Sequence, residues 1–454
     1  MKVIIKTLFW GSIFFFFFIT NQLFAQKKWS LQECINNAFE NSYEIKQRML
    51  EKESKNIQLQ TTKTGIAPSL GTNVSQSFDF GWSQQADNLM INSSQTTTSF
   101  GVGLNMDLFK GLRTYHQITS NKLDLEAILF DIESAKESIE LAVTAYYMQI
   151  LVNKEMLEAL KIQVQLSKEQ AHRIEILVKN GKSSDSELYA AKSTLANDQL
   201  SVVEAQNTVR LSILDLAQLM NYPDVNNFDI ENEIDSNFEA ILNDNIDIDV
   251  IKNIALCSRP AMKAALSKIE LAKRHIRITQ SGWYPSLSLS ASYGTGNFYR
   301  FNDIIVELPN GEKVILPNEP FGSQLKNNSR FSVGISLYVP IFDKLSTHFA
   351  VKQQKINVKF QELQLEETKR SLIKSIEQAF TNAVASKEKY FASQVAYTSS
   401  LVAFQYEEIK YNAGSSSNYE FNEAKNRYLR AQSNLIQAKF DYLFRVLILE
   451  YYGR

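Results

Sequence analysis

The sequence predicts a mainly helical chain with a smaller strand-rich part, built from two copies of one unit. Residues 36–66 align with residues 253–283 at one constant offset, and later segments align at a second constant offset. Two long stretches lack both proline and glycine, and four shorter segments alternate between apolar and small polar residues. A repeat of this length indicates pseudo-symmetric architecture rather than two independent enzymes.

The alignment of the two copies predicts where the chain divides. We expect a signal peptide over 1–25, a first repeat over 26–221, a linker over 222–248 and a second repeat over 249–454. Each repeat runs through a helix, two strands, a long helix and a shorter returning helix. The change of offset between the aligned blocks indicates that the second copy has the longer loop between its two strands.

The N-terminus has the features of a secretory signal. Lys2 and Lys6 precede a phenylalanine-rich apolar stretch, and Leu23-Phe24-Ala25 forms a suitable cleavage site. The apolar stretch is shorter than the roughly 20 residues that a spanning helix needs. No later segment resembles a transmembrane helix, so a mature chain that crosses a membrane must do so as a barrel of strands.

Four strands are predicted, at about 68–82, 98–109, 284–298 and 329–342. Each has one apolar face and one face of serine, glycine and asparagine, a pattern that a soluble sandwich would also show. Four strands cannot close by themselves, and aromatic residues near their ends are typical of membrane-interface girdles. Identical chains in a symmetric oligomer could complete one barrel. The predicted interface aromatics are Phe80, Trp82, Phe109, Trp283, Tyr284 and Phe342.

Two helical hairpins are predicted, over about 115–221 and 346–451. Apolar residues recur in steps of four and three along each long helix, as in a coiled coil. At 1.5 Å per residue such a helix spans roughly 100 Å. Each long helix ends at a glycine, Gly181 or Gly414, followed by residues suited to capping the next helix. Helices at about 31–64 and 249–282 have the length to stack end to end with the returning helices.

Composition and motifs exclude several classes of function. The formal net charge is −1, which gives no electrostatic reason to expect nucleic acid. The linker over 222–248 is acidic and has no lysine or arginine, which favours a solvated connection at the waist of the chain. Cys34 and Cys257 are expected to be small buried residues rather than a disulfide, and the four histidines lack the spacing of metal ligands. We therefore expect no metal, no cofactor and no catalytic constellation.

The order of these elements resembles that of the TolC family of bacterial outer-membrane efflux proteins, the outer membrane factors. The resemblance covers essentially the whole mature chain and rests on the duplicated order and the Gly-x-Ser tips of the hairpins. It implies a homotrimer with a 12-stranded outer-membrane β-barrel, continuous with a periplasmic α-helical coiled-coil barrel. It also implies outer-membrane lipid, a periplasmic adaptor (membrane fusion protein) and an inner-membrane RND, ABC or MFS transporter as partners.

The resemblance also suggests site residues at the hairpin tips. Alignment on Gly414 places Glu420 and Glu423 at the family's two acidic gate positions, and the first copy has Glu187 and Ala190 there. Ser416 replaces a basic residue often found at the tip, which puts the family's closing ion pair in doubt. For adaptor docking, the small residues of both tips are the candidates, although turn formation explains them equally well. They are Gly181, Lys182, Ser183, Ser184, Gly414, Ser415, Ser416 and Ser417.

Together with these features, the resemblance implies a passive exit duct for small toxic solutes or drugs. The same fold could serve as the exit of a type I protein-secretion system. A structural coiled-coil protein of the envelope is a less favoured alternative, because it does not need the serine- and glycine-rich strand faces. An enzyme is the least favoured reading of the sequence.

Overall fold

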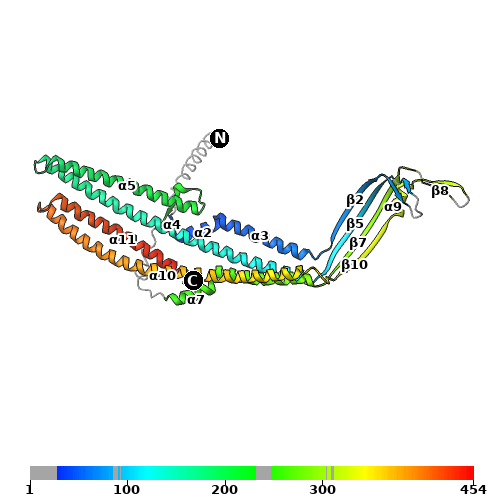
Figure 1. The fold of residues 1–454 in the computed structure, drawn as a ribbon. Helices are drawn as coiled ribbons and strands as arrows, with labels where there is room; N and C mark the ends of the chain where they lie inside the picture. Colours follow the sequence, from blue (N-terminus) through cyan, green and yellow to red (C-terminus); the bar gives the residue numbers. More distant parts are fainter. Residues whose placement is uncertain are drawn as a thin grey trace, which may run out of the picture. The chain divides into compact units, whose positions relative to one another are not determined.

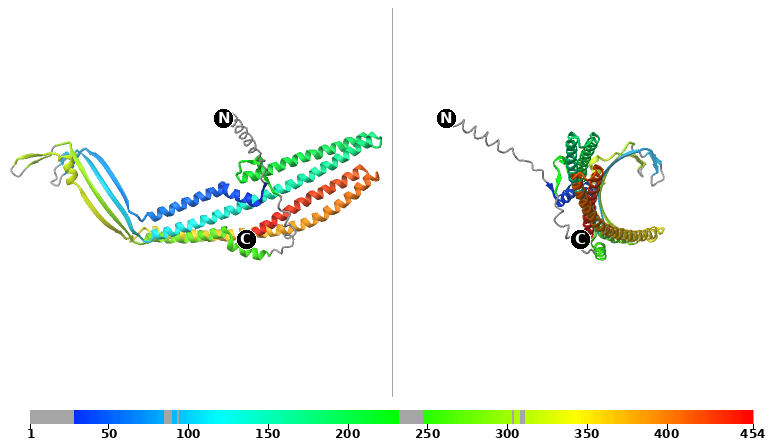
Figure 2. Two further views of the ribbon diagram at one scale, coloured as in Figure 1. Left: turned by 180° about the vertical axis from the view of Figure 1, so that it is seen from behind. Right: turned by 90° about the vertical axis from the view of Figure 1, so that its left-hand side faces the viewer.

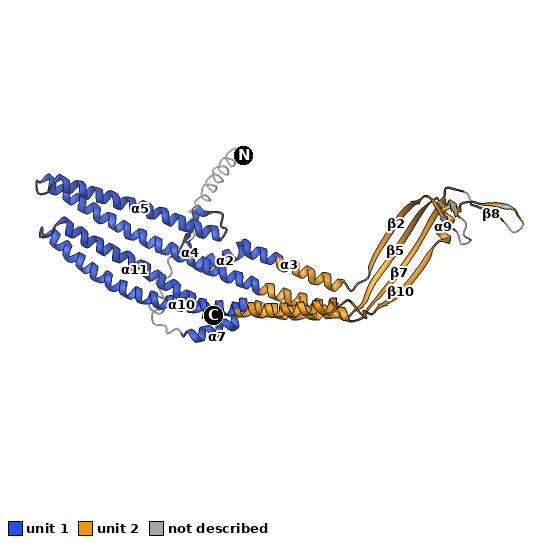
Figure 3. Cartoon of the chain, in the orientation of Figure 1, with its two compact units in different colours: residues 1–50, 130–263, 367–454 blue, residues 51–129, 264–366 orange. Residues whose placement is uncertain are grey.

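The computed structural model describes residues 28–84, 90–92, 94–231, 247–302, 304–307 and 311–453. The predicted signal peptide over 1–25 lies outside these residues. The chain forms two compact units, each assembled from separate segments (Figures 1 and 3). Unit 1 comprises residues 1–50, 130–263 and 367–454, and unit 2 comprises residues 51–129 and 264–366.

Unit 1 contains the two hairpins. The first joins α4 (Arg113–Lys179), whose residues from 130 onward belong to this unit, to α5 (Asp185–Leu219). The second joins α10 (Ser346–Asn412), in this unit from residue 367, to α11 (Asn418–Gly453). Both turns have a glycine in the left-handed region, with φ of 70° at Gly181 and 74° at Gly414. The amide after each glycine donates to a carbonyl five residues earlier, which is the Schellman arrangement of a helix C-terminus.

The main core of unit 1 lies where α4, α5 and α11 meet the first helix and the start of the linker. Tyr147, Ile150, Leu216 and Leu443 are fully buried there. A short parallel pair, β1 (Lys28–Trp29) and β6 (Asp229–Ile230), covers this core, and Tyr147 donates through its hydroxyl to the Glu231 carbonyl at 2.7 Å. Of the linker residues up to 231, Phe228 and Ile230 are buried in this core, whereas Pro223, Asp224 and Asn227, at the end of the 3-10 helix η1 (Val225–Asn227), are exposed. The linker residues 232–246 lie outside the described part.

Each helix expected at the start of a repeat is in fact two helices. The first divides into α2 (Leu31–Asn41) and α3 (Tyr43–Thr64), and the second into α7 (Ile248–Ser258) and α8 (Pro260–Gln280). The breaks fall at Ser42 and Arg259, which have nearly the same extended backbone, with ψ of 128° and 130°. Arg259 precedes a proline, and proline disfavours helical backbone in the residue before it. At Ser42 the side chain accepts from the Ile45 amide at 3.5 Å and so begins the next helix.

The two cysteines have different environments. Cys34 is buried in the core of unit 1, and burial raises the pKa of its thiol to about 12. Cys257 is exposed, and both cysteines are free. The expectation that both are buried is therefore wrong for Cys257, because this residue lies on the open face of the short helix α7.

Unit 2 is organised around one antiparallel sheet in the order β10-β7-β5-β2, which appears as a single curved layer in Figure 2. The strands are β2 (Ser69–Asp79), β5 (Gln95–Lys110), β7 (Ser286–Arg300) and β10 (Arg330–Tyr338). Leu70, Val74, Phe331 and Ile335 on its apolar face are all more than 60 % exposed. Among the described residues, no helix combines the length and the apolar character needed to cross a membrane.

The loops between paired strands carry structure that the sequence did not predict. In the first copy, β3 (Trp82–Gln84) pairs with β4 (Met90–Asn92). In the second copy, β8 (Ile304–Glu307) pairs with β9 (Lys313–Leu316), and helix α9 (Phe321–Asn327) follows. The 3-10 helix η3 (Ser281–Trp283) precedes β7. The extra length of the second loop is therefore used to form a helix.

Helix α9 and its flanks replace a missing strand at the end of β7. The pairing of β10 with β7 begins at Gly294, whereas the pairing of β5 with β7 continues to Arg300. The Gln324 carboxamide accepts from the Phe298 amide at 2.9 Å and donates to the Phe298 carbonyl at 3.0 Å. Asn318 makes the same two contacts with Arg300, each at 3.0 Å. Side-chain amides thus satisfy backbone groups that would otherwise lack a partner.

Candidate functional site: the hairpin tips and the contact between hairpins

The tip of the first hairpin is held by helix capping. Ser184 precedes α5, and its hydroxyl accepts from the Glu187 amide at 3.3 Å. Ser183 donates through its hydroxyl to the Glu187 carboxylate. Glu187 therefore stabilises the start of α5, where a negative charge is also favoured by the helix dipole.

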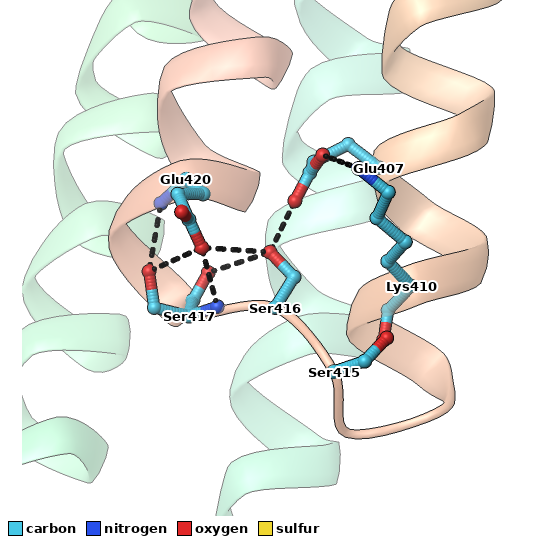
Figure 4. A network of polar contacts seen from close by, with 6 residues as sticks. All are labelled: Glu407, Lys410, Ser415, Ser416, Ser417 and Glu420. Carbon is cyan, nitrogen blue, oxygen red and sulfur yellow. Dashed lines mark hydrogen bonds and ion pairs between the residues drawn. The ribbon is translucent and has the colours of Figure 1, made fainter.

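The tip of the second hairpin repeats this arrangement with more contacts (Figure 4). The Glu420 carboxylate accepts from the Ser417 amide at 2.9 Å and from the Ser416 hydroxyl at 3.2 Å, while Ser417 accepts from the Glu420 amide at 3.3 Å. These hydrogen bonds, with that from the Ser417 amide the strongest, hold the pKa of Glu420 below its usual value. Ser416 also donates to Glu407, which pairs with Lys410 at 3.4 Å. Helix capping, which is a complete capping box only at the second tip, accounts for the acidic residue that both copies share.

Glu423 has no acidic counterpart in the first copy, and its contact is of a different kind. It lies one turn after Glu420 on α11 and forms an ion pair with Arg427. Both side chains remain substantially exposed. The matching residues of the first copy are Ala190 and Thr194, so this ion pair is confined to the second hairpin. The first turns of α11 therefore carry two negative groups, Glu420 and Glu423, and one positive group, Arg427.

A buried polar cluster, formed by Gln163, Ser167, Asp198 and Lys425, joins the two hairpins and was not anticipated from the sequence. The Lys425 side chain is 3 % exposed and lies 3.6 Å from the Asp198 carboxylate. Lys425 also donates to Ser167, and Gln163 donates to Asp198 at 2.6 Å. Burial lowers the pKa of Lys425, and the charge of Asp198 opposes this shift. The cluster ties α11 to both helices of the first hairpin.

Two further contacts join the hairpins closer to their tips. Gln170 on α4 donates to Asn418 at 2.7 Å. Arg173, one turn further on, donates to the Asn412 carbonyl at 3.2 Å, and its guanidinium lies 5.1 Å from the centre of the Tyr411 ring. A cation at this place satisfies carbonyl groups left open at the end of α10. The two hairpins of one chain are therefore fastened together along several turns.

The seam inside the second hairpin is aromatic. Tyr411 stacks on Phe421 with ring centres 4.6 Å apart, and Phe404 stacks on Tyr428 at 5.4 Å. The matching positions of the first hairpin hold Val178, Leu188, Ala171 and Leu195, which pack as a smaller aliphatic cluster. The two hairpins thus have the same order of helices, but the side chains packed between the helices are larger in the second hairpin.

The other predicted site residues are placed as follows. All six aromatics proposed for the membrane interface are exposed, from 42 % at Phe109 to 76 % at Phe342. Their role at the interface stays a prediction, as does the role of the tip residues in docking. Within the described ranges, no group of three or more histidine, cysteine, aspartate or glutamate residues is arranged to hold a metal ion.

Comparison with known sequences decides the family. Residues 34–222 and 252–449 match the outer membrane efflux protein family, so the match covers both repeats. The chain belongs to this family. Its members are outer-membrane channels of bacteria rather than enzymes, with an extended helical region in the periplasm, as the sequence analysis predicted.

Two curated relatives share part of the chain. The sequence is 27 % identical to TolC of Escherichia coli over 188 residues, which is 41 % of this chain and 36 % of that protein. It is 26 % identical to TolC of Vibrio cholerae over 189 residues, which is 42 % of this chain and 39 % of that protein. The chain therefore aligns with less than half of the length of either relative.

Solved structures share the fold over nearly the whole chain. The CusC structure matches with a TM-score of 0.74 and 14 % identity, covering 95 % of both chains. The Campylobacter jejuni CmeC outer membrane channel also matches with a TM-score of 0.74, at 18 % identity, covering 93 % of this chain and 85 % of that one. These likenesses confirm the predicted fold class, including the two-fold repeat of helices and strands.

Proposed function

We propose that the protein is the outer-membrane exit duct of a tripartite efflux system. The family match over both repeats is the observation that carries this proposal. The duct conducts small toxic solutes passively, and an inner-membrane pump with a periplasmic adaptor supplies the energy and the cargo.

The proposed duct is a homotrimer. Each chain supplies one four-stranded sheet whose edge strands, β2 and β10, have no further strand partner among the described residues. Free sheet edges favour pairing with another chain, and closure of the sheet removes them. Three chains would bring their sheets together into one closed layer within the outer membrane.

The polar face of the sheet would line the water-filled path. Small hydroxyl side chains pair across neighbouring strands on this face, with Ser75 and Ser99 oxygens 2.6 Å apart and Ser292 and Ser332 oxygens 2.8 Å apart. Mutual pairing satisfies these groups without a large side chain, so the face stays wettable and open. The apolar side chains of the opposite face would meet outer-membrane lipid.

The second hairpin would form the periplasmic gate, with Glu423 as its selectivity residue. Glu420 is committed to the helix cap, whereas Glu423 points from the next turn and is held by a solvent-exposed ion pair. A ring of such carboxylates around a trimer axis would favour cations. Glu423→Gln should lower the preference for cations over anions in bilayer recordings, whereas Ala190→Gln at the matching place in the first copy should not. An unchanged selectivity in Glu423→Gln would remove Glu423 from the gate.

Adaptor docking would use the grooves beside the two tips. The tip glycines leave open space around their α-carbons, and the serines beside them are short. Small residues let a second hairpin approach closely, although the same residues also form the turns. The docking residues therefore remain those predicted at the two tips.

The kind of molecule that the duct exports distinguishes solute efflux from protein secretion. In a strain that lacks this gene, the proposed function predicts that a fluorescent efflux substrate accumulates and that plasmid-borne wild type restores its export. Normal dye export together with loss of a secreted protein from the medium would favour the type I secretion duct instead. Normal dye export with unchanged secretion would argue against both transport roles.

A further inference from the structure

The two hairpins pack together through one surface on the first hairpin and one surface on the second. Because of the repeat, each of these surfaces has a matching surface on the other hairpin, and the contact within the chain leaves this second pair of surfaces uncovered. Within the chain, α4 of the first hairpin packs against α11 of the second through Ser167, which accepts from Lys425, and Gln170, which donates to Asn418. The offset that relates Gly181 to Gly414 relates α4 to α10 and α5 to α11. The matching pair of surfaces therefore lies on α10 and α5.

Burial differs sharply between matching residues on the long helices. Ala159, Ser167 and Gln170 are buried on α4, because α11 covers them. Their counterparts on α10 are Ala392, Ser400 and Ala403, of which the two alanines are exposed and the serine is half-buried. The difference follows from the presence of a neighbour in one case and not in the other, because the residues themselves are similarly small or smaller.

The returning helices show the same contrast. Lys425 on α11 is buried against the first hairpin, whereas its counterpart on α5, Lys192, is exposed. Large apolar side chains also lie open on both unused surfaces. On α10, Tyr406 is 66 % exposed, and on α5, Tyr189 is 69 % and Val203 is 60 % exposed.

We propose that a second copy of the chain occupies these surfaces, so that α10 of one copy packs against α5 of the next with Lys192 opposite Ser400, and that this contact lacks a buried ion pair. The proposal rests on the homotrimer of the proposed function and adds the residues of its helical contact. Because the two surfaces differ, the contact is head-to-tail and generates a ring when it closes.

The charge partner of Lys425 is missing from the predicted contact between copies. Asp198, which faces Lys425 within the chain, corresponds to Ala431, and Gln163 corresponds to Ala396. Lys192 would therefore meet a serine hydroxyl and two alanines. Within its own hairpin, Lys192 acts on the Glu175 carboxylate, which already pairs with Lys179 at 3.2 Å.

This difference makes the contact between copies weaker than the contact between hairpins. A lysine that loses water without gaining an acid opposes burial. The chain keeps its own two hairpins together through the ion pair and through Arg173, while the copies separate more readily along the α10 and α5 surfaces. Separation of the helical tube would thus begin between subunits.

Cross-linking with cysteines tests the residue pairing in the full-length protein. In a Cys257→Ser background, Lys192→Cys with Ser400→Cys should give two- and three-chain species with a short bismaleimide, whereas either cysteine alone should not. The matched pair Ser167→Cys with Lys425→Cys should link within one chain and add no higher mass. A trimeric mass in detergent without cross-linked species would overturn the pairing and leave the proposed trimer standing. A monomeric mass would overturn both.

Restoring or removing charge tests the missing ion pair. Lys192→Met should raise the temperature at which the oligomer dissociates in detergent, because it removes the unpaired charge from the contact. Ala431→Asp should raise it as well, and Ala431→Asn should not. The gain from Ala431→Asp should disappear in the Lys192→Met background. Lower oligomer stability in Lys192→Met, with helix content unchanged, would overturn the proposal.

Discussion

Two aligned lysines, Lys192 and Lys425, have different environments in the two copies of the repeat. Lys192 is exposed within the chain, whereas Lys425 is buried between the two hairpins beside Asp198. A buried ion pair contributes little net stability by itself, but loss of one partner leaves an uncompensated buried charge. The alignment of the two lysines could not predict the burial of Lys425. An alignment shows which residues of the two copies correspond, but it does not show that Lys425 on α11 contacts Asp198 on α5.

Removal of one partner should therefore cost more than removal of both. We expect Lys425→Met to lower the free energy of unfolding by about 3 kcal/mol, because Asp198 would then stay buried without a positive partner. Lys425→Met with Asp198→Asn should recover most of this loss. Denaturant unfolding of the detergent-solubilised protein measures both values. Equal losses in the single and double variants would show that the charges are not coupled.

Glu420 predicts a pH dependence at the second tip. Hydrogen bonds from Ser417 and Ser416 lower the pKa of Glu420 in the folded state below its ordinary value of 4.5. The stabilisation is therefore complete above pH 4.5 and is lost as the pH falls through the folded pKa. Amide hydrogen exchange in the first turn of α11, corrected for intrinsic rates, should show weaker protection below pH 4.5. Glu420→Gln should lack this change, and an identical change in Glu420→Gln would assign it to another group.

Among the elements, the hairpins could be predicted from the sequence and the outer loop of the second copy could not. Long stretches without proline or glycine, ended by Gly181 and Gly414, leave little choice but two helices and a tight turn. The break at Ser42 has no proline after it, so local propensity does not reveal it. Helix α9 is only seven residues long and depends on the end of β7 for its contacts, which no local pattern records.

The exposed end of β7 should depend on Gln324. Gln324→Ala removes both contacts with the Phe298 backbone, and the Phe298 amide should then exchange with solvent at least about tenfold faster, as loss of roughly 1.4 kcal/mol of protection implies. Asn327→Ala on the same helix is the control, because Asn327 makes only a long exposed contact with Glu319 at 3.4 Å. Hydrogen exchange of the segment 295–300 provides the measurement. Unchanged exchange in Gln324→Ala would show that α9 does not protect this edge.

For the whole molecule, the duplication carried most of what the sequence could predict. The repeated order of elements indicated the fold class, and the family match over both repeats confirms it. The division into two units cuts through the long helices, so it follows from tertiary contacts rather than from any boundary in the sequence. Differences between the copies, in the acid at Glu423, in the burial of Lys425 and in helix α9, mark the features that repetition alone could not predict.

Single-channel recording of the purified protein in planar lipid bilayers tests the central claim most directly. The proposed duct predicts discrete current steps from the wild-type oligomer, with a preference for cations that falls in Glu423→Gln. The absence of any current step from a folded, trimeric preparation that has inserted into the bilayer would contradict the claim that this protein forms a channel.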